Sequence, residues 1–281
     1  MPSQAATPIA EAEIAKALPR RANAAHKGDF GRVLIVGGGV GMPGAARLAG
    51  EACLRVGAGL VTVATMPENA AAITAGRPEL ICLPVGDPAT LNALIEHMDV
   101  VAVGPGLGQS DWAREVLEKT LAADRPMILD ADALNLLSLG GRGGQEGSER
   151  PWVLTPHPGE AARLLGVTTE DVQSDRSKAL ETLVERYRCV VVLKGAGTLV
   201  GAPAKPSGLC GRGNPGMATA GMGDVLTGAI AGILAQCRDP WTAARVGVLV
   251  HAMAGDRAGR AGERGLIASD VIRELRTCVN V

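Results

Sequence analysis

A run of small residues that leads straight into an aliphatic segment, Asn214 to Gly228 (NPGMATAGMGDVLTG), has the clearest chemical potential in the sequence. Its main-chain N–H groups can converge on an anion where a helix begins, because the helix dipole adds attraction there. We expect this anion hole to be formed by Ala220, Gly221, Met222 and Gly223. Asp224 follows directly. A carboxylate beside a phosphate is unfavourable unless it has a task, such as taking the proton of a hydroxyl that attacks phosphorus. The alternative is that Asp224 only caps the helix.

Two further glycine-rich segments follow apolar runs, at 37–46 (GGGVGMPGAA) and 104–108 (GPGLG). Glycines let a backbone approach a ligand closely, and a helix that starts after them offers N–H groups to an anion. The first segment fits neither the G-x-G-x-x-G dinucleotide pattern, because Met42 takes the place of the third glycine, nor a Walker A loop, because no Lys-Ser/Thr pair is present. Tight turns without a ligand remain the alternative for both segments.

Two other candidate loops each contain one polar residue after an apolar run. His157 stands between Pro156 and Pro158, which hold it rigidly and suit a ligand contact, although a lone His is often structural. Lys194 opens the segment 194–198 (KGAGT) at the end of a buried strand, where a phosphate or ribose would satisfy its charge. A simple hairpin turn is the alternative for this segment.

Asp130 and Asp132 also follow an apolar run. Their carboxylates suit a sugar or a hydrated magnesium ion, or they cap the next helix, and the sequence leaves these alternatives open. The six cysteines never approach a C-x-x-C spacing, so the sequence predicts no zinc ribbon, no redox pair and no dedicated metal cage. We interpret them as small buried apolar residues in a reducing compartment.

The elements that position these residues follow from alternating apolar runs and helical patterns, which indicate an α/β fold with a mostly parallel sheet. Continuous aliphatic runs are typical of buried parallel strands. We predict strands at 32–36, 60–64, 100–103, 127–130, 152–154 and 190–193. We predict helices at 45–56, 111–123, 131–139, 159–165, 173–187, 224–236, 241–258 and 269–278. Residues 1–25 are an Ala-rich extension with one possible short helix, 140–150 are an exposed loop, and 1–281 form one domain.

Composition excludes several classes of function. The 28 Lys and Arg residues nearly balance the 29 Asp and Glu residues, and only five residues are aromatic, so nucleic acid is disfavoured as a partner. With 47% hydrophobic residues the chain is not disordered. No signal peptide and no apolar stretch of about 18 residues are recognisable, so we expect a cytoplasmic protein without a membrane partner.

The motifs together resemble one family. HKGDFG, GGGVGMPGAARLA, GLVTVAT, GPGLG, LDADALN, TPHPGE, VVLKGAGT and GNPGMATAGMGDVLTG, in this order, closely resemble the NAD(P)H-hydrate dehydratase family, in the form of a stand-alone dehydratase domain without the epimerase domain. The resemblance spans roughly 25–254 and implies a ribokinase-like fold, a three-layer α/β/α sandwich with a mostly parallel central sheet. It also implies repair of hydrated NADH or NADPH (NADHX or NADPHX) at the expense of ADP, or of ATP, with Mg²⁺ bridging the nucleotide phosphates.

Carried over by position, the resemblance implies a site residue by residue. The hydrated nicotinamide substrate is expected at Ala46, Gly108, His157 and Asp224. The adenine nucleotide is expected at Lys194, Gly195, Ala196, Gly197, Thr198 and Gly223. Two departures are visible: the stretch often written G-G-T-G-D in related kinases is Ala220 to Asp224 here, and no epimerase domain precedes the dehydratase. The family's habits suggest a homo-oligomer, a tetramer, working with a separate epimerase.

The implied chemistry is phosphorylation of the ring hydroxyl, because phosphate leaves readily where hydroxide does not. Asp224 takes the hydroxyl proton, the ring nitrogen expels phosphate, and AMP (or ADP) is released. Two alternatives stay open: a true kinase of the same fold acting on a vitamin-precursor alcohol, and a nucleotide-sensing protein without turnover.

Overall fold

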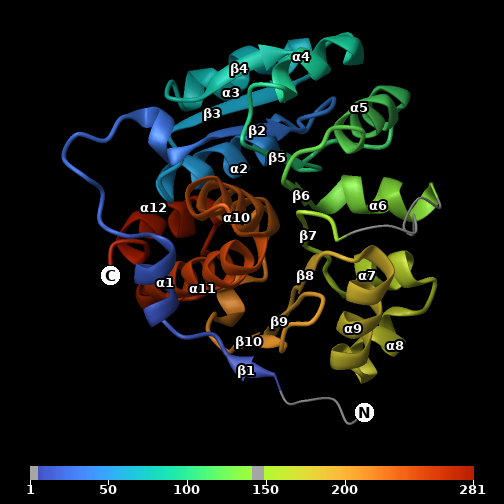
Figure 1. The fold of residues 1–281 in the computed structure, drawn as a ribbon, viewed down its shortest axis with the longest axis vertical. Helices are drawn as coiled ribbons and strands as arrows, with labels where there is room; N and C mark the ends of the chain where they lie inside the picture. Colours follow the sequence, from blue (N-terminus) through green and yellow to red (C-terminus); the bar gives the residue numbers. More distant parts are fainter. Residues whose placement is uncertain (1–5, 141–148) are drawn as a thin grey trace.

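The computed structural model describes residues 6–140 and 149–281. In this part of the chain ten strands form one sheet, in the order β1-β10-β9-β8-β7-β6-β5-β2-β3-β4 (Figure 1). All neighbours pair in parallel except at β9, which runs antiparallel to β8 and β10. The strands are β1 Thr7–Pro8, β2 Arg32–Val36, β3 Leu60–Thr65, β4 Ile81–Pro84, β5 Val100–Val103, β6 Met127–Leu129, β7 Trp152–Leu154, β8 Val190–Leu193, β9 Thr198–Gly201 and β10 Gly208–Cys210.

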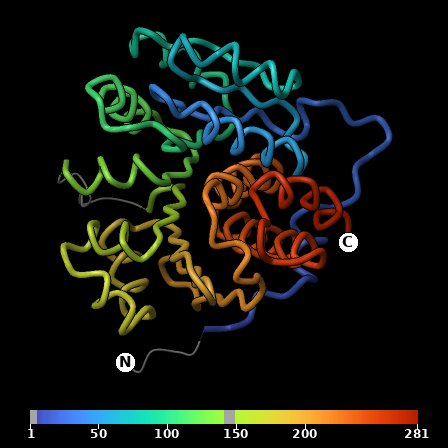
Figure 2. The backbone as a smooth tube through the Cα atoms, turned by 180° about the vertical axis from the view of Figure 1, so that it is seen from behind, coloured from blue at the N-terminus to red at the C-terminus, as the bar shows by residue number. Residues whose placement is uncertain are grey.

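Helices cover both faces of the sheet. One apolar core contains Val33 and Ile35 of β2, and the other contains Leu34 and Val36, because successive side chains point to opposite faces. The helices are α1 Ala12–Ala17, α2 Pro43–Arg55, α3 Ala70–Gly76, α4 Leu91–Ile95, α5 Asp111–Leu121, α6 Ala131–Leu139, α7 Pro158–Leu165, α8 Thr169–Ser174, α9 Arg176–Tyr187, α10 Met222–Cys237, α11 Pro240–Ala258 and α12 Ala268–Cys278. Helices α2, α10, α11 and α12 pack on one face, and α5, α6, α7 and α9 on the other, which gives the predicted three layers (Figure 2).

The sequence located most of the central elements. The predicted strands correspond to β2, β3, β5, β6, β7 and β8, with β6 ending one residue earlier than predicted, before Asp130. The predicted helix at 173–187 was wrong in its continuity, because Asp175 ends α8 and caps α9 by accepting the Lys178 amide. The predicted loop at 140–150 lies largely outside the described residues. All six cysteines are free, and four of them are buried.

The strand order reverses between β2 and β5, whose following loops lead to helices on opposite faces. These two loops lie backbone to backbone: the Gly38 amide donates to Pro105 O over 3.0 Å, and the Gly39 amide donates to Gly106 O over 2.6 Å. A Cβ atom at Gly37 would lie 2.1 Å from Pro105 O, so only glycine fits there. Several glycines of these loops therefore serve loop packing, at the edge where open α/β sheets bind ligands.

Helix α10 is fixed in the core by equally close contacts. A Cβ atom at Gly228 would lie 1.9 Å from Ala49 O of α2, and one at Gly247 of α11 would lie 2.6 Å from the Ile230 side chain of α10. Most of α10 from Val225 to Ala235 is buried. The residues before Val225 thus project from a rigidly packed helix toward the carboxyl ends of the strands.

Candidate active site

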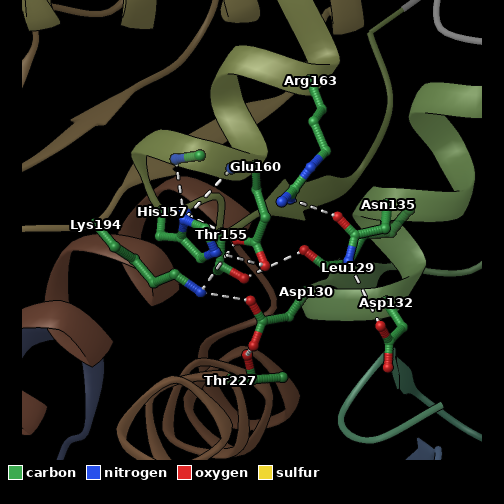
Figure 3. Close-up of polar contacts among 11 residues, drawn as sticks. Leu129, Asp130, Asp132, Asn135, Thr155, His157, Glu160, Arg163, Lys194 and Thr227 are labelled. Carbon is green, nitrogen blue, oxygen red and sulfur yellow. Dashed lines mark hydrogen bonds and ion pairs between the residues drawn. The ribbon is translucent and has the colours of Figure 1, made fainter. Parts of the chain in front are cut away.

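The candidate site lies where the loops after β6, β7 and β8 meet the first turn of α10 (Figure 3). Helix α10 starts at Met222, and its N-cap residue Gly221 has a φ of 87°, which glycine adopts without strain. Within the described part of the chain, no side chain caps this helix. The amides of its first turn have no intrahelical acceptor, so they are free to bind an anion.

Asp224 lies in the first turn of α10 and does not cap it. Burial, together with the nearby negative charges of Asp130 and Asp132, raises the pKa of Asp224 to about 7, although the Lys194 ammonium acts in the opposite direction. Groups that exchange protons in catalysis work best with a pKa near the working pH. A carboxyl with this pKa can exchange a proton near neutral pH.

Lys194 follows directly after β8, and its ammonium group is held by a buried carboxylate. Lys194 Nζ lies 2.7 Å from Asp130 Oδ1, and Thr227 Oγ1 of α10 donates to Asp130 Oδ2 over 2.8 Å (Figure 3). Asp130 is only 1% exposed. Burial acts to lower the pKa of Lys194, but the surrounding carboxylates of Asp130, Glu160 and Asp224 together raise it, so the ammonium stays charged.

His157 caps α7. Its Nδ1 atom accepts the amides of Gly159 and Glu160, so in the neutral ring the proton is on Nε2, 3.4 Å from Glu160 Oε1. Burial, with the positive charges of Lys194 and Arg163, lowers the pKa of His157 despite the nearby Glu160 and Asp130 carboxylates. The half-exposed ring therefore offers an N–H donor rather than a lone pair.

The segment 194–198 is a hairpin between β8 and β9, as the turn alternative predicted. Arg176 of α9, which sequence reasoning missed, holds this hairpin: its guanidinium donates to Leu193 O, Lys194 O and Gly197 O. Gly195 lies against the same guanidinium, and Thr198 Oγ1 donates to Gly195 O over 3.0 Å. No sequence signal marks Arg176, because a basic residue near the start of a surface helix is ordinary.

Of the other residues predicted to bind the nicotinamide substrate, Gly108 lies at the site and Ala46 is buried behind it. Gly108 lies beside the site, and its amide donates to Asp132 Oδ2 over 2.8 Å. Ala46 is fully buried and packs behind Gly38, so it has no exposed surface for a ligand in this conformation. A Cβ atom at Gly41 of the first loop, or at Gly44 in the first turn of α2, would meet no atom of the described residues within 4 Å, so both glycines face open space.

Glu160 and Thr227 are further polar residues of the site that sequence reasoning did not single out. Glu160 Oε2 lies 3.7 Å from Lys194 Nζ and accepts the His157 amide over 2.8 Å, and both Glu160 and Thr227 are buried. Buried polar side chains inside the quoted motifs TPHPGE and GDVLTG were the available signal.

Among the described residues, no three His, Cys, Asp or Glu side chains lie close enough together to hold a metal ion. No helix in the described ranges is both long and apolar enough to cross a bilayer.

Comparisons with known proteins identify the family of this chain. A model of the NAD(P)H-hydrate dehydratase family matches residues 33–276. The chain is 51% identical over 94% of its length to the bifunctional NAD(P)H-hydrate repair enzyme Nnr of Coxiella burnetii, of which it covers 53%. It thus spans about half the length of the curated relatives it matches.

Two solved structures show the fold. The ADP/ATP-dependent NAD(P)H-hydrate dehydratase of Bacillus subtilis, co-crystallised with ATP/Mg²⁺, is similar with a TM-score of 0.89 and 31% identity, over 98% of each chain. Ribokinase of Thermotoga maritima is similar in fold alone, with a TM-score of 0.57 and 16% identity over 90% of this chain and 100% of its own. The fold is ribokinase-like, and the chain belongs to the NAD(P)H-hydrate dehydratase family.

Proposed function

We propose that this chain catalyses the nucleotide-dependent dehydration of hydrated NADH or NADPH, with ADP as the phosphoryl donor and ATP as the alternative donor. The observation that carries the proposal is the Asp224 carboxyl, whose pKa is raised to about 7 by burial and nearby carboxylates, beside the uncapped start of α10. A base, an anion-binding turn and a charged Lys194 lie together. Phosphoryl transfer needs these three features.

In the proposed reaction the oxygen of the ring hydroxyl attacks the terminal phosphorus of the nucleotide, and Asp224 accepts the proton of that hydroxyl. The bond between that phosphorus and the leaving AMP (or ADP) breaks, and the amides of Ala220 to Gly223 bind the phosphoryl oxygens during transfer. The ring nitrogen then expels phosphate, and loss of a ring proton restores the double bond. The nucleotide is placed along 194–198 because this hairpin follows β8 directly after Lys194 and is held in one conformation by Arg176 of α9.

Magnesium fits this site only as an ion carried by the nucleotide, because the described side chains form no cage for it. It would neutralise phosphate charge, and the Asp132 carboxylate, near enough to influence Asp224, is the group that would meet its water shell. The proposed roles of Ala46, Gly108 and His157 toward the nicotinamide ring rest on the family resemblance. For Ala46 a contact requires the first loop to open, because the residue is buried.

The proposal is tested by incubating the purified chain with hydrated NADH and ADP, ATP or no nucleotide, while the absorbance band of reduced nicotinamide is followed. Recovery of the band that requires nucleotide, with release of phosphate, is the expected result. A phosphorylated product without recovery would support the alternative kinase. Nucleotide binding with neither product would support the sensing protein.

Three finer expectations belong to the same proposal. We propose a homotetramer in the cytoplasm that works together with an NAD(P)H-hydrate epimerase activity. The support for the link to an epimerase is that the relatives are named bifunctional NAD(P)H-hydrate repair enzymes. Light scattering of the purified chain measures the assembly, and assay of both epimers of the hydrate with and without added epimerase measures the dependence.

A further inference from the structure

The buried carboxylate of Asp130 is the centre of the polar network beneath the site. One of its oxygens lies 2.7 Å from Lys194 Nζ, and the other accepts the Thr227 hydroxyl over 2.8 Å. Asp130 thereby connects the end of β8 to the first turns of α10. Removing one member of a buried ion pair leaves the other charge without compensation, so this pair fixes the Lys194 head group strongly.

The backbone next to Asp130 adopts an uncommon conformation. Ala131 has a φ of 48°, in the left-handed region that an alanine seldom adopts. Asp130 on one side of Ala131 contacts Lys194, and Asp132 on the other side accepts the Gly108 amide. Unfavourable backbone conformations of this kind persist where the surrounding structure requires them, often at functional sites.

Three carboxylates, those of Asp130, Glu160 and Asp224, lie near enough to the Lys194 ammonium to act on it. The ammonium lies 2.7 Å from Asp130 and 3.7 Å from Glu160, and it also acts on Asp224 electrostatically. In the part of the chain that the structure describes, Asp224 has no ion pair with Lys194 within 4.0 Å. A carboxylate paired directly with an ammonium is a weaker base. Burial is the largest influence on the pKa of Asp224, and the position of Lys194 modulates it.

Building on the proposed function, we propose that Asp130 is a positioning residue that holds the Lys194 ammonium beside Gly223 and keeps it from pairing with Asp224. Lys194 then presents its charge to the phosphoryl group, while Asp224 stays free to accept a proton. Thr227 fixes the rotamer of Asp130 in this arrangement. The charged groups that act on Asp224 are Asp130, Asp132 of α6 and Lys194. His251 of α11 lies near Met222, and burial lowers its pKa to about 4, so it carries no charge at neutral pH.

The test compares Asp130→Asn with Thr227→Val as the matched control, because the second variant disturbs the same network without removing charge. In Asp130→Asn, Lys194 is released toward Asp224 and a like charge is lost, so both changes lower the pKa of Asp224. The acidic limb of the kcat/KM profile should move to lower pH by about one unit or more. Because the ammonium is displaced, kcat at high pH should fall by about 100-fold. Thr227→Val should lower kcat less and leave the limb in place.

An NMR titration and a double variant test the role of Asp130 further. A carbon-detected NMR titration of the Asp224 carboxyl reports its pKa in wild type and variant without any turnover, so it separates this inference from the proposed function. If Asp130→Asn does not fold, Asp130→Asn/Lys194→Met removes both charges, and it should fold with an acidic limb near that of wild type and a low kcat. A folded Asp130→Asn whose Asp224 titrates as in wild type, or a double variant with wild-type kcat, overturns the proposal. Absence of any dehydration by the wild-type chain would instead reject the proposed function.

Discussion

Gly223 of α10 faces the ammonium group of Lys194: a Cβ atom built on Gly223 would lie 3.4 Å from Lys194 Nζ and 3.7 Å from Asp130 Oδ2. This separation leaves room for a methyl group at ordinary contact distance. The same methyl group would stand between the ammonium and any phosphate bound at the start of α10. The hydrogen side chain of Gly223 thus keeps the two charges within reach of each other.

Gly223→Ala is therefore expected to separate folding from nucleotide use. Alanine favours a helix over glycine by up to about 1 kcal/mol, so the free energy of unfolding should be unchanged or higher. The KM for the nucleotide should rise by about tenfold or more, because the methyl group shields the anion site. Gly228→Ala in the same helix is the contrasting control, since its Cβ atom would overlap Ala49 O and should destabilise the fold. Thermal unfolding and steady-state kinetics measure both effects.

Asp224→Asn is expected to abolish dehydration yet stabilise the protein at alkaline pH. The folded pKa of about 7 exceeds the ordinary value of 3.8, so the folded state binds the proton more tightly than the unfolded chain. The ionised carboxylate thus destabilises the fold: the penalty is complete above about pH 7, shrinks as the pH falls from 7, and disappears only below the ordinary pKa of 3.8. At about pH 8 the variant should gain up to about 4 kcal/mol of unfolding free energy, and at about pH 5 less than half as much. Denaturant unfolding at the two pH values checks the sign, and an equal gain at both would contradict it.

Arg176→Met is expected to loosen the hairpin at 194–198 because three carbonyls lose their shared donor. The cost in stability should be about 1 to 2 kcal/mol, and the KM for the nucleotide should rise more than kcat falls. Arg176→Lys should not restore wild-type behaviour, since one ammonium group cannot replace the planar guanidinium. Lys178→Met, at an exposed position of the same helix, is the control and should behave as wild type. An unchanged nucleotide KM in Arg176→Met would argue against a nucleotide at this hairpin.

His157→Asn and His157→Ala together distinguish a helix cap from a ligand contact. Asparagine is a good N-cap, so His157→Asn should keep the stability of α7, whereas His157→Ala should lose about 1 kcal/mol. If the ring contacts the hydrated substrate through its Nε2 proton, both variants should raise the KM for that substrate to a similar extent. Wild-type KM in His157→Asn would leave the residue with a structural role only. Kinetics at saturating nucleotide give the comparison.

Much of the fold was predictable because its central strands are continuous aliphatic runs. Runs such as RVLIV and VVAV have no other plausible location than a buried parallel sheet, and β2 and β5 fall at the predicted residues. The edge strands β1 and β4, and β10 next to β1, were missed since they are short and carry Pro or Gly. The break at Asp175 was missed because a cap inside an amphipathic pattern changes no apolar position.

The candidate site was predictable in its loops but not in its contacts. The sequence marked Asp224, Lys194 and Asp130 as polar residues next to strands or at a helix start. It could not indicate that Asp130 and Thr227 meet, because their contact joins residues far apart in the chain. Nor could it separate glycines that pack loops, such as Gly37, from those that face open space, such as Gly41.

The close fit of Gly228 against Ala49 has a consequence for how this enzyme could change its substrate. Helix α10 packs against the main chain of α2 at Gly228, so it has little room to slide or turn. The position of its first turn is therefore set by the packing of the core. New substrates would have to be admitted by reshaping the loops after β2, β5 and β7. A search for variants with altered specificity should therefore randomise those loops and leave the helix pair α2 and α10 untouched.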